Sequence, residues 1–227
     1  MKTMLLAAGR GERMGSLCET LPKPLLNLVG ETLIERQIRL LRAAGQRELV
    51  INLSWHGAQI RRRLGDGAQH GVAIEYAEEG EPPLETAGGI VNALPLLGPQ
   101  PFLVANSDIV TDFDFSMLPP LAGKLSGGRD GLLGALVLVA NPPHHREGDY
   151  AVDARGLARM SGKLLTYSGI SALHPDLFVG VTPGRGKLRP LFDAAISAGR
   201  IAGLVHEGLW IDVGTPERLQ QAQQALR

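Results

Sequence analysis

The sequence predicts an α/β protein in which helices cover both faces of a mostly parallel sheet, giving three layers. Short apolar segments typical of buried strands alternate along the chain with longer segments of helical periodicity. Helical crossovers between successive strands favour parallel pairing, with helices on both sides of the sheet. The chain has 227 residues, of which 44% are hydrophobic. This suits a sizeable core, and we expect residues 1–227 to form a single domain.

Each expected element has a local signal. The first helix begins at a capping-box spacing, Thr32 to Glu35, and its apolar stripe ends near Gly45. Residues 123–131 are glycine-rich and predict a long loop, whereas no repeat or linker divides the chain. Strands are expected at residues 4–8, 49–53, 72–76, 102–105, 132–140, 166–173 and 201–206, and further helices at 58–64, 86–94, about 188–198 and 216–226.

Composition excludes several classes of function. Lys plus Arg and Asp plus Glu both number 23, so the chain lacks the basic excess of a nucleic-acid-binding protein. The single cysteine, Cys18, excludes an internal disulfide and a cysteine-based zinc site. The apolar runs 4–8 and 132–140 are too short for a signal peptide and for a membrane span, respectively. We therefore expect a cytoplasmic protein that binds neither nucleic acid nor membrane.

The segment "LLAAGRGERMGSLCETLPKPLL", residues 5–26, follows the first strand with a glycine-rich, basic loop. It fits neither the dinucleotide-binding fingerprint, because its glycines are spaced one residue too widely, nor the P-loop, because the lysine is missing. Glycines such as Gly9 and Gly11 let backbone N–H groups approach an anion closely, and Arg13 and Lys23 add positive charge. The segment predicts a phosphate site, mobile over residues 9–21 without nucleotide; the alternative is an ordinary basic surface loop.

Three segments resemble, in the right order, the signatures of the sugar-1-phosphate nucleotidyltransferases: residues 5–26, "LVANSDIV" at 103–110 and "LWIDVGTPERL" at 209–219. Further segments, "GEPPLETAGGI", "NPPHHREGD" and "YSGISALHP", are most similar to the bacterial N-acetylmuramate-1-phosphate uridylyltransferases of cell-wall recycling. The resemblance implies a Rossmann-like, GT-A-like fold with a mostly parallel mixed sheet. It also implies transfer of UMP from UTP to a sugar 1-phosphate, N-acetylmuramate 1-phosphate, with release of pyrophosphate. The hexapeptide repeats of relatives with an acyltransferase tail are missing.

The resemblance also assigns roles to residues. Arg13 and Lys23 would be the catalytic cations, and Asp108 and Asp212, each at the end of a short apolar strand, would hold magnesium, which prefers oxygen ligands. A helix N-cap or turn role is the alternative for either aspartate alone, and we expect Asp112 and Asp114 to cap the following helix. The implied nucleotide contacts are Leu6, Ala7, Ala8, Gly9, Gly11, Glu85, Thr86 and Asn106. The implied sugar contacts are Asn141, Gly148, Asp149, Lys163, Tyr167, Ser168 and Gly169, with Lys163 also a candidate for phosphate contact.

Two rival functions remain open at this stage. One is a nucleotidyltransferase of another specificity, such as a mannose-1-phosphate guanylyltransferase or a choline-phosphate cytidylyltransferase. The other is a non-catalytic regulator that binds nucleotide sugars, against which the joint presence of Arg13, Lys23, Asp108 and Asp212 argues. The sequence also departs from many relatives by Ser107, where they carry glycine. No segment suggests an assembly module, so a monomer is compatible with the sequence.

Overall fold

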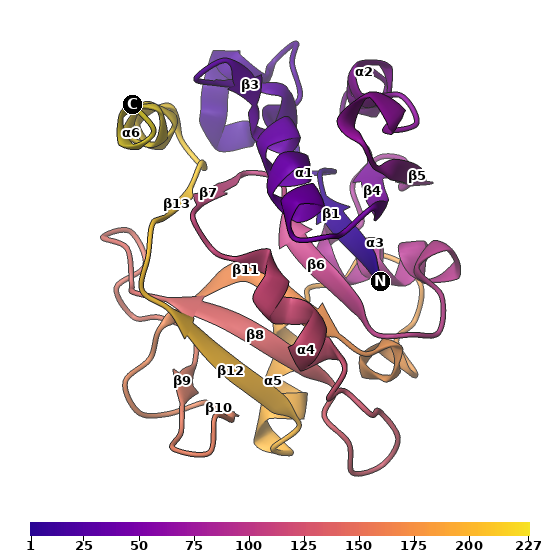
Figure 1. The fold of residues 1–227 in the computed structure, drawn as a ribbon, viewed down its shortest axis with the longest axis vertical. Helices are drawn as coiled ribbons and strands as arrows, with labels where there is room; N and C mark the ends of the chain where they lie inside the picture. Colours follow the sequence, from indigo (N-terminus) through magenta and orange to yellow (C-terminus); the bar gives the residue numbers. More distant parts are fainter.

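The computed structural model describes residues 1–227 and is built around a seven-stranded sheet (Figure 1). Its strands run in the order β12-β8-β11-β6-β1-β4-β5. Strand β11 is antiparallel to both of its neighbours, and every other pair in this sheet is parallel, which confirms a mostly parallel mixed sheet. The strands are β1 (Lys2–Leu6), β4 (Glu48–Leu53), β5 (Ala73–Glu78), β6 (Phe102–Asn106), β8 (Gly134–Val139), β11 (Thr166–Leu173) and β12 (Ile201–His206).

Two apolar cores, one on each face of the sheet, confirm the three layers. Adjacent strand residues point to opposite faces, so Leu5 enters one core and Met4 the other. Helices α1 (Leu33–Ala43), α2 (Gly57–Leu64) and α4 (Leu118–Ala122) contribute to the first core. Helices α3 (Glu85–Leu97) and α5 (Arg189–Ser197) contribute to the second. No helix is both long enough and apolar enough to span a bilayer.

A two-stranded ladder outside the main sheet joins the segment after β6 to the last strand of the chain. Strands β7 (Ile109–Thr111) and β13 (Trp210–Asp212) are antiparallel, and Asp212 pairs with Ile109. Asp212 therefore ends a short strand, as the sequence suggested, but this strand belongs to the separate ladder and not to the main sheet. Because β7 follows β6 almost at once, the ladder nevertheless carries Asp212 to the same edge of the molecule as Asp108. Two further ladders join β2 (Asn27–Leu28) to β3 (Glu31–Thr32) and β9 (Ala151–Val152) to β10 (Ala158–Arg159).

A third, smaller core anchors the loop that follows β1. Within this loop, Met14 and Cys18 are buried against Leu33 of α1 and Val213 after β13. Helix α6 (Pro216–Ala225) closes this core through Ala222. The loop predicted to be mobile is therefore fastened at its middle by apolar contacts. The short 3₁₀ helices are η1 (Glu12–Cys18), η2 (Lys23–Leu25), η3 (Ala68–His70), η4 (Phe115–Met117) and η5 (Pro175–Phe178).

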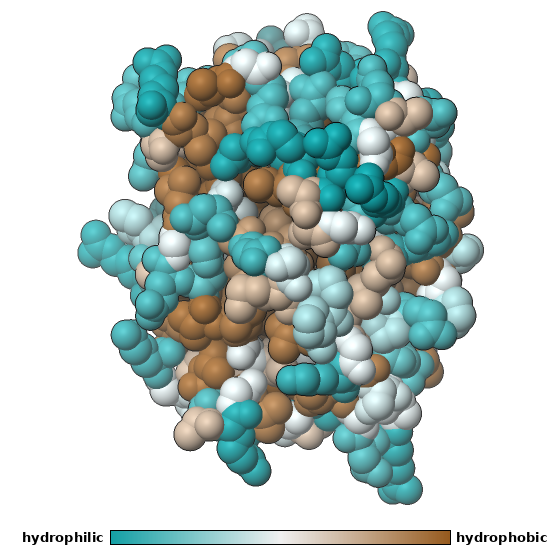
Figure 2. Space-filling model, viewed as in Figure 1, coloured by the Kyte–Doolittle hydropathy of each residue, from teal (hydrophilic) through white to brown (hydrophobic).

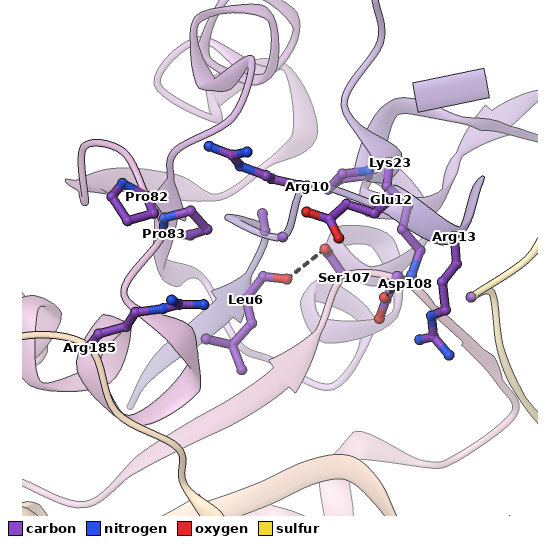
Figure 3. A pocket seen from close by; sticks show the side chains of 15 residues that line it. Leu6, Arg10, Glu12, Arg13, Lys23, Pro82, Pro83, Ser107, Asp108 and Arg185 are labelled. Carbon is purple, nitrogen blue, oxygen red and sulfur yellow. Dashed lines mark hydrogen bonds and ion pairs between the residues drawn. The ribbon is translucent and has the colours of Figure 1, made fainter. Parts of the chain in front are cut away.

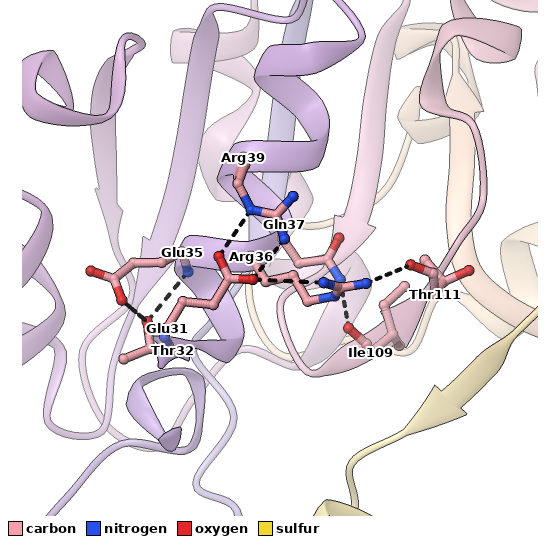
Figure 4. A network of polar contacts seen from close by, with 8 residues as sticks. All are labelled: Glu31, Thr32, Glu35, Arg36, Gln37, Arg39, Ile109 and Thr111. Carbon is pink, nitrogen blue, oxygen red and sulfur yellow. Dashed lines mark hydrogen bonds and ion pairs between the residues drawn. The ribbon is translucent and has the colours of Figure 1, made fainter. Parts of the chain in front are cut away.

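Helix α1 supports strand β7 through two side chains (Figure 4). The capping box predicted at its start is confirmed, because the Thr32 hydroxyl accepts from the Glu35 N–H and the Glu35 carboxylate accepts from the Thr32 N–H. Further along, wholly buried Gln37 donates from Nε2 to the Ile109 carbonyl at 2.5 Å. Arg36 donates to the Thr111 carbonyl at 3.4 Å. Both ends of β7 are therefore tied to α1, which fixes the strand that follows Asp108.

The two aspartates after β7 differ in role. Asp114 caps η4 by accepting from the Ser116 N–H at 2.9 Å, as predicted. Hydrogen bonding from the side chain of Ser116, and then from its N–H, lowers the pKa of the Asp114 carboxyl group. Asp112 caps no helix and instead lies 3.0 Å from Nε2 of His206, which corrects the expectation for this residue. On the face seen in Figure 2, hydrophilic residues separate small apolar patches.

Candidate active site

The loop after β1 and the loop after β6 enclose a polar cleft of about 670 Å³ (Figure 3). It lies beyond the carboxyl ends of these two parallel strands, where α/β sheets commonly bind ligands. Pro82 and Pro83 form part of another wall. Four cationic side chains line it: Arg10, Arg13, Lys23 and Arg185. Only two acidic ones do, Glu12 and Asp108, so the cleft carries an excess of positive charge within a protein of zero net charge.

Lys23 explains the two prolines that flank it. Only 9% of this residue is exposed, and its ammonium donates a short hydrogen bond to the Asp108 carboxylate. A buried ammonium needs an opposite charge close by, because it has lost its water shell. Pro22 and Pro24 restrict the backbone around Lys23 and hold the turn in place. The ion pair therefore fixes a cation and a carboxylate together in the cleft.

Arg13 differs from Lys23, since it is exposed and forms no ion pair. It lines both the cleft and a neighbouring pocket of about 640 Å³, which also contains Asp212. A Cβ atom on Gly214 would lie 3.2 Å from the Arg13 guanidinium and would overlap that of Arg218. Glycine at this position therefore leaves room for two arginine side chains beside the cleft.

Asp212 lines the neighbouring pocket, whereas Asp108 lines the cleft. The Val213 N–H donates to the Asp108 carbonyl at 2.8 Å, so the two aspartates are close along the ladder. Asp212 forms an ion pair with Arg218 of α6 and lies 3.0 Å from Nε2 of His144. No group of three or more His, Cys, Asp or Glu side chains forms a ready metal cage. Two carboxylates suit Mg²⁺, which usually completes its shell with phosphate oxygens and water.

All eight residues predicted to bind nucleotide lie at the cleft or at an adjoining pocket of about 300 Å³. Ala7 and Gly11 line the cleft, and the smaller pocket is lined by Leu6, Ala8, Gly9, Glu85, Thr86 and Asn106. Sequence reasoning missed the pair that joins these segments. Asn52 accepts from the Ala7 N–H at 2.7 Å and donates to Glu79 at 2.5 Å. Glu79 accepts in turn from the Leu84 N–H at 2.8 Å. A lone asparagine within an apolar strand was the available signal.

The start of α3 is capped from a distant segment rather than by Thr86. The Gly186 carbonyl accepts from the N–H groups of Ala87 and Gly88, at 2.9 and 3.2 Å. The Gly186 N–H donates to the Leu84 carbonyl at 2.9 Å, so residues 184–188 form a strap across the beginning of the helix. This strap carries Arg185 into the cleft, where it lies 3.1 Å from Glu85. The sequence analysis did not identify Arg185.

Comparison with known proteins agrees with this geometry. The model of a family described as "Nucleotidyl transferase" matches residues 2–143. The chain belongs to this family. It is 46% identical to the N-acetylmuramate alpha-1-phosphate uridylyltransferase of Neisseria meningitidis serogroup B, over 98% of this chain and 97% of that protein. Its identity to the protein of the same name from Caulobacter vibrioides is 32%, over 98% and 96%. A crystal structure of a Bacillus anthracis protein in complex with sucrose shares the fold, with a TM-score of 0.87 and 19% identity, covering 100% and 95% of the two chains.

Ser107 gives this nucleotidyl transferase a hydrogen bond that glycine could not supply. Its hydroxyl donates to the Leu6 carbonyl at 2.6 Å, and its N–H donates to the same oxygen at 3.1 Å. The side chain is buried at the ends of β1 and β6. The departure from the family pattern therefore joins two strand ends beneath the cleft.

The residues predicted to contact sugar separate into two groups. Asp149, Tyr167 and Gly169 line a pocket of about 310 Å³, the aromatic pocket, together with Tyr150 and Phe192. The other four do not line it. The Asn141 amide bonds to the Leu164 carbonyl and the Thr166 hydroxyl, and the Ser168 hydroxyl accepts from the Ile170 N–H. Gly148 adopts a left-handed φ of 69° in a loop, and Lys163 is exposed on a turn. Direct sugar contact stays a prediction for all seven residues.

The single cysteine provides a probe of the loop over the cleft. Burial raises the pKa of the Cys18 thiol, against the opposing effect of nearby Lys23, so the reactive thiolate is scarce at neutral pH. We expect a disulfide reagent to modify the folded protein slowly, and several-fold more slowly when a nucleoside triphosphate and magnesium order residues 9–21. The measurement is the modification rate with and without ligand, with urea-unfolded protein as the control. Equal rates with and without ligand would contradict a closing loop.

Proposed function

We propose that this protein transfers UMP from UTP to N-acetylmuramate 1-phosphate and releases pyrophosphate. The observation that carries the proposal is the cleft in which Arg13, Lys23 and Asp108 meet, in a chain 46% identical over 98% of its length to a uridylyltransferase of that specificity. The specificity is taken from the relative, and the reaction type is supported by the charge and position of the cleft residues. With these proposed substrates, the protein would act in the cytoplasm, in the recycling of cell-wall sugars.

Electrostatics and positioning supply most of the catalysis in this proposal. Both substrates are polyanions, and an oxygen of the sugar phosphate must reach the α-phosphorus of UTP. Cations that are already in place lower the cost of that approach, and no covalent intermediate is needed. Lys23, held by Asp108, would contact the α-phosphate and the incoming phosphate. Arg13, which has no acidic partner, would hold the leaving pyrophosphate.

Magnesium is the proposed cofactor, and Asp108 and Asp212 are its proposed ligands. The ion would supply positive charge to the phosphate oxygens at the reacting centre. Lys23 and Arg218 orient the two carboxylates from either side, so each is held in position by a cationic neighbour. The backbone N–H groups of Gly9 and Gly11 would line the nucleotide.

The proposal is tested with a matrix of substrates. Purified protein is mixed with UTP, GTP, CTP or dTTP and with N-acetylmuramate 1-phosphate, N-acetylglucosamine 1-phosphate, mannose 1-phosphate or phosphocholine. We expect the fastest pyrophosphate release with UTP and N-acetylmuramate 1-phosphate. A preference for GTP with mannose 1-phosphate, or for CTP with phosphocholine, would replace the proposed specificity. Silence with every pair would favour a non-catalytic regulator.

Removal of either cation should slow turnover. Arg13→Ala and Lys23→Ala should each lower kcat by roughly 10²-fold or more, the scale for losing one preorganised electrostatic partner. Arg13→Ala should leave the melting temperature nearly unchanged, because Arg13 is exposed and unpaired. Lys23→Ala should also lower the free energy of unfolding by roughly 1–3 kcal/mol, because Asp108 loses its partner. The matched control is Arg62→Ala on α2, an exposed arginine outside the cleft. Wild-type kcat in both cleft variants would contradict the role of these cations.

The two aspartates should act through one ion. Asp108→Asn and Asp212→Asn keep side-chain size but remove charge, and each should lower turnover by roughly 10²-fold or more, with partial recovery at high magnesium. The double variant should be scarcely slower than the slower single variant, because effects exerted through one ion are not additive.

A magnesium titration of each variant measures this, with Asp114→Asn as the control because that carboxylate only caps η4. Chelation should silence the wild type reversibly. Near-normal turnover of Asp212→Asn at every magnesium concentration would reduce Asp212 to an ion-pair partner of Arg218.

A further inference from the structure

The aromatic pocket has a rigid wall. It adjoins the pocket of about 300 Å³ that contains Glu85 and Thr86, here named the nucleotide pocket after its proposed ligand. The two pockets share Leu6, Thr86 and Asn106, so a molecule in the aromatic pocket would lie directly beside the nucleotide. The Tyr167 ring packs edge-on against Phe192, with ring centroids 5.4 Å apart, and its hydroxyl lies 3.0 Å from that of Ser171. An aromatic wall fixed in this way suits the apolar face of a sugar ring.

The charges of the aromatic pocket do not cancel. Its one carboxylate, Asp149, is already partnered by Arg189 at 2.8 Å and by His145 at 3.2 Å. Lys187 also lines the pocket, and its ammonium has no hydrogen bond and no acidic partner. The cleft already supplies four cations for the phosphates, and a pocket that holds only the hydroxyl groups of the sugar ring needs no additional cation. The unpaired charge therefore points to an anionic group on the ligand.

The backbone on both sides of Lys187 is anchored. Gly186 is fastened to the start of α3 by three backbone hydrogen bonds. Leu188 is buried in the core beneath the sheet, and α5 begins at the next residue. The long side chain of Lys187 can change its rotamer, but its Cα atom is held beside the pocket by the anchored backbone. This arrangement limits the ordering cost of a contact between its ammonium and a ligand.

We infer that Lys187 determines specificity by binding a carboxylate carried by the sugar 1-phosphate. The inference rests on the proposed function, because N-acetylmuramate differs from N-acetylglucosamine by a lactyl ether that ends in a carboxylate. Arg189 forms an ion pair with Asp149, so Lys187 is the cation of this pocket that is available to bind a ligand. A charge-assisted bond to the lactyl group favours the acidic sugar, and a neutral sugar phosphate leaves the ammonium in water.

The test compares Lys187→Met with the wild type, using UTP and three sugar 1-phosphates. These are N-acetylmuramate 1-phosphate, the same compound with its lactyl carboxylate converted to an amide, and N-acetylglucosamine 1-phosphate. With the first, kcat/KM should fall by about 10-fold or more, mainly through KM, the scale of one hydrogen bond to a charged group. With the two compounds that lack the carboxylate, the fall in kcat/KM should be several-fold smaller. Lys187→Arg should retain most of the discrimination, and Lys124→Met, an exposed lysine after α4, should behave as wild type.

The outcomes separate the inference from the proposed function. If the wild type uses N-acetylmuramate 1-phosphate and Lys187→Met does so equally well, the inference is overturned and the function stands. An equal loss with all three sugars would make Lys187 a contact to the shared 1-phosphate or a structural residue, and either result would overturn the inference. If the wild type prefers a neutral sugar phosphate, the proposed function itself fails, and the carboxylate contact fails with it.

Discussion

The arrangement of the cleft depends on one ion pair, between Lys23 and Asp108. Lys23 comes from the turn that ends the glycine-rich loop, and Asp108 comes from the corner between β6 and β7. A nearly buried ammonium needs a compensating charge beside it. The position of the Asp108 carboxylate therefore determines where the turn that carries Lys23 can pack against the strand ends. The Ser107 hydroxyl fixes the same corner to the end of β1. Cation, carboxylate and nucleotide loop are therefore positioned together rather than separately.

Around this ion pair, different layers of the fold support different substrates. The main sheet carries the nucleotide pocket at the ends of β1, β4 and β6, where Asn52 and Glu79 connect the loops. The β7–β13 ladder carries the second carboxylate, Asp212, from more than 100 residues further along the chain. Gln37 donates to the backbone of this ladder from α1, while Arg218 of α6 pairs with the carboxylate. A small displacement of α6 would therefore move the Asp212 carboxylate, which does not line the pocket that Asp108 shares with Thr86 and Asn106.

Sequence patterns were sufficient for whatever depends on burial and periodicity. The order of strands and helices and the capping box at Thr32 followed from such patterns. The family resemblance suggested Gly9, Thr86 and Asn106, which meet in one pocket because parallel strands end at one edge. Sequence patterns were not sufficient where hydrogen bonds between distant segments determine the local structure. The Gly186 carbonyl that caps α3 and the pairing of β13 with β7 leave no local trace. The family resemblance gave Asn141 and Ser168 as sugar contacts, and the sequence did not reveal the hydrogen bonds that their side chains form with backbone groups and with Thr166.

The strap over α3 links the two substrate sites through the spacing of its residues. Arg185 lines the phosphate cleft, whereas Lys187 and Arg189 line the aromatic pocket. The residues between them hold the strap in place, since Gly186 caps α3 and Leu188 is buried in the core. Cationic residues therefore occupy every second position of the strap, and the residues that anchor the strap occupy the positions between them. The Gly186 carbonyl also fixes the helix start that lines the proposed nucleotide pocket, so the strap contributes to both proposed sites. The physical element common to both sites is this backbone segment, and its three cations suit two anionic substrates that must bind side by side.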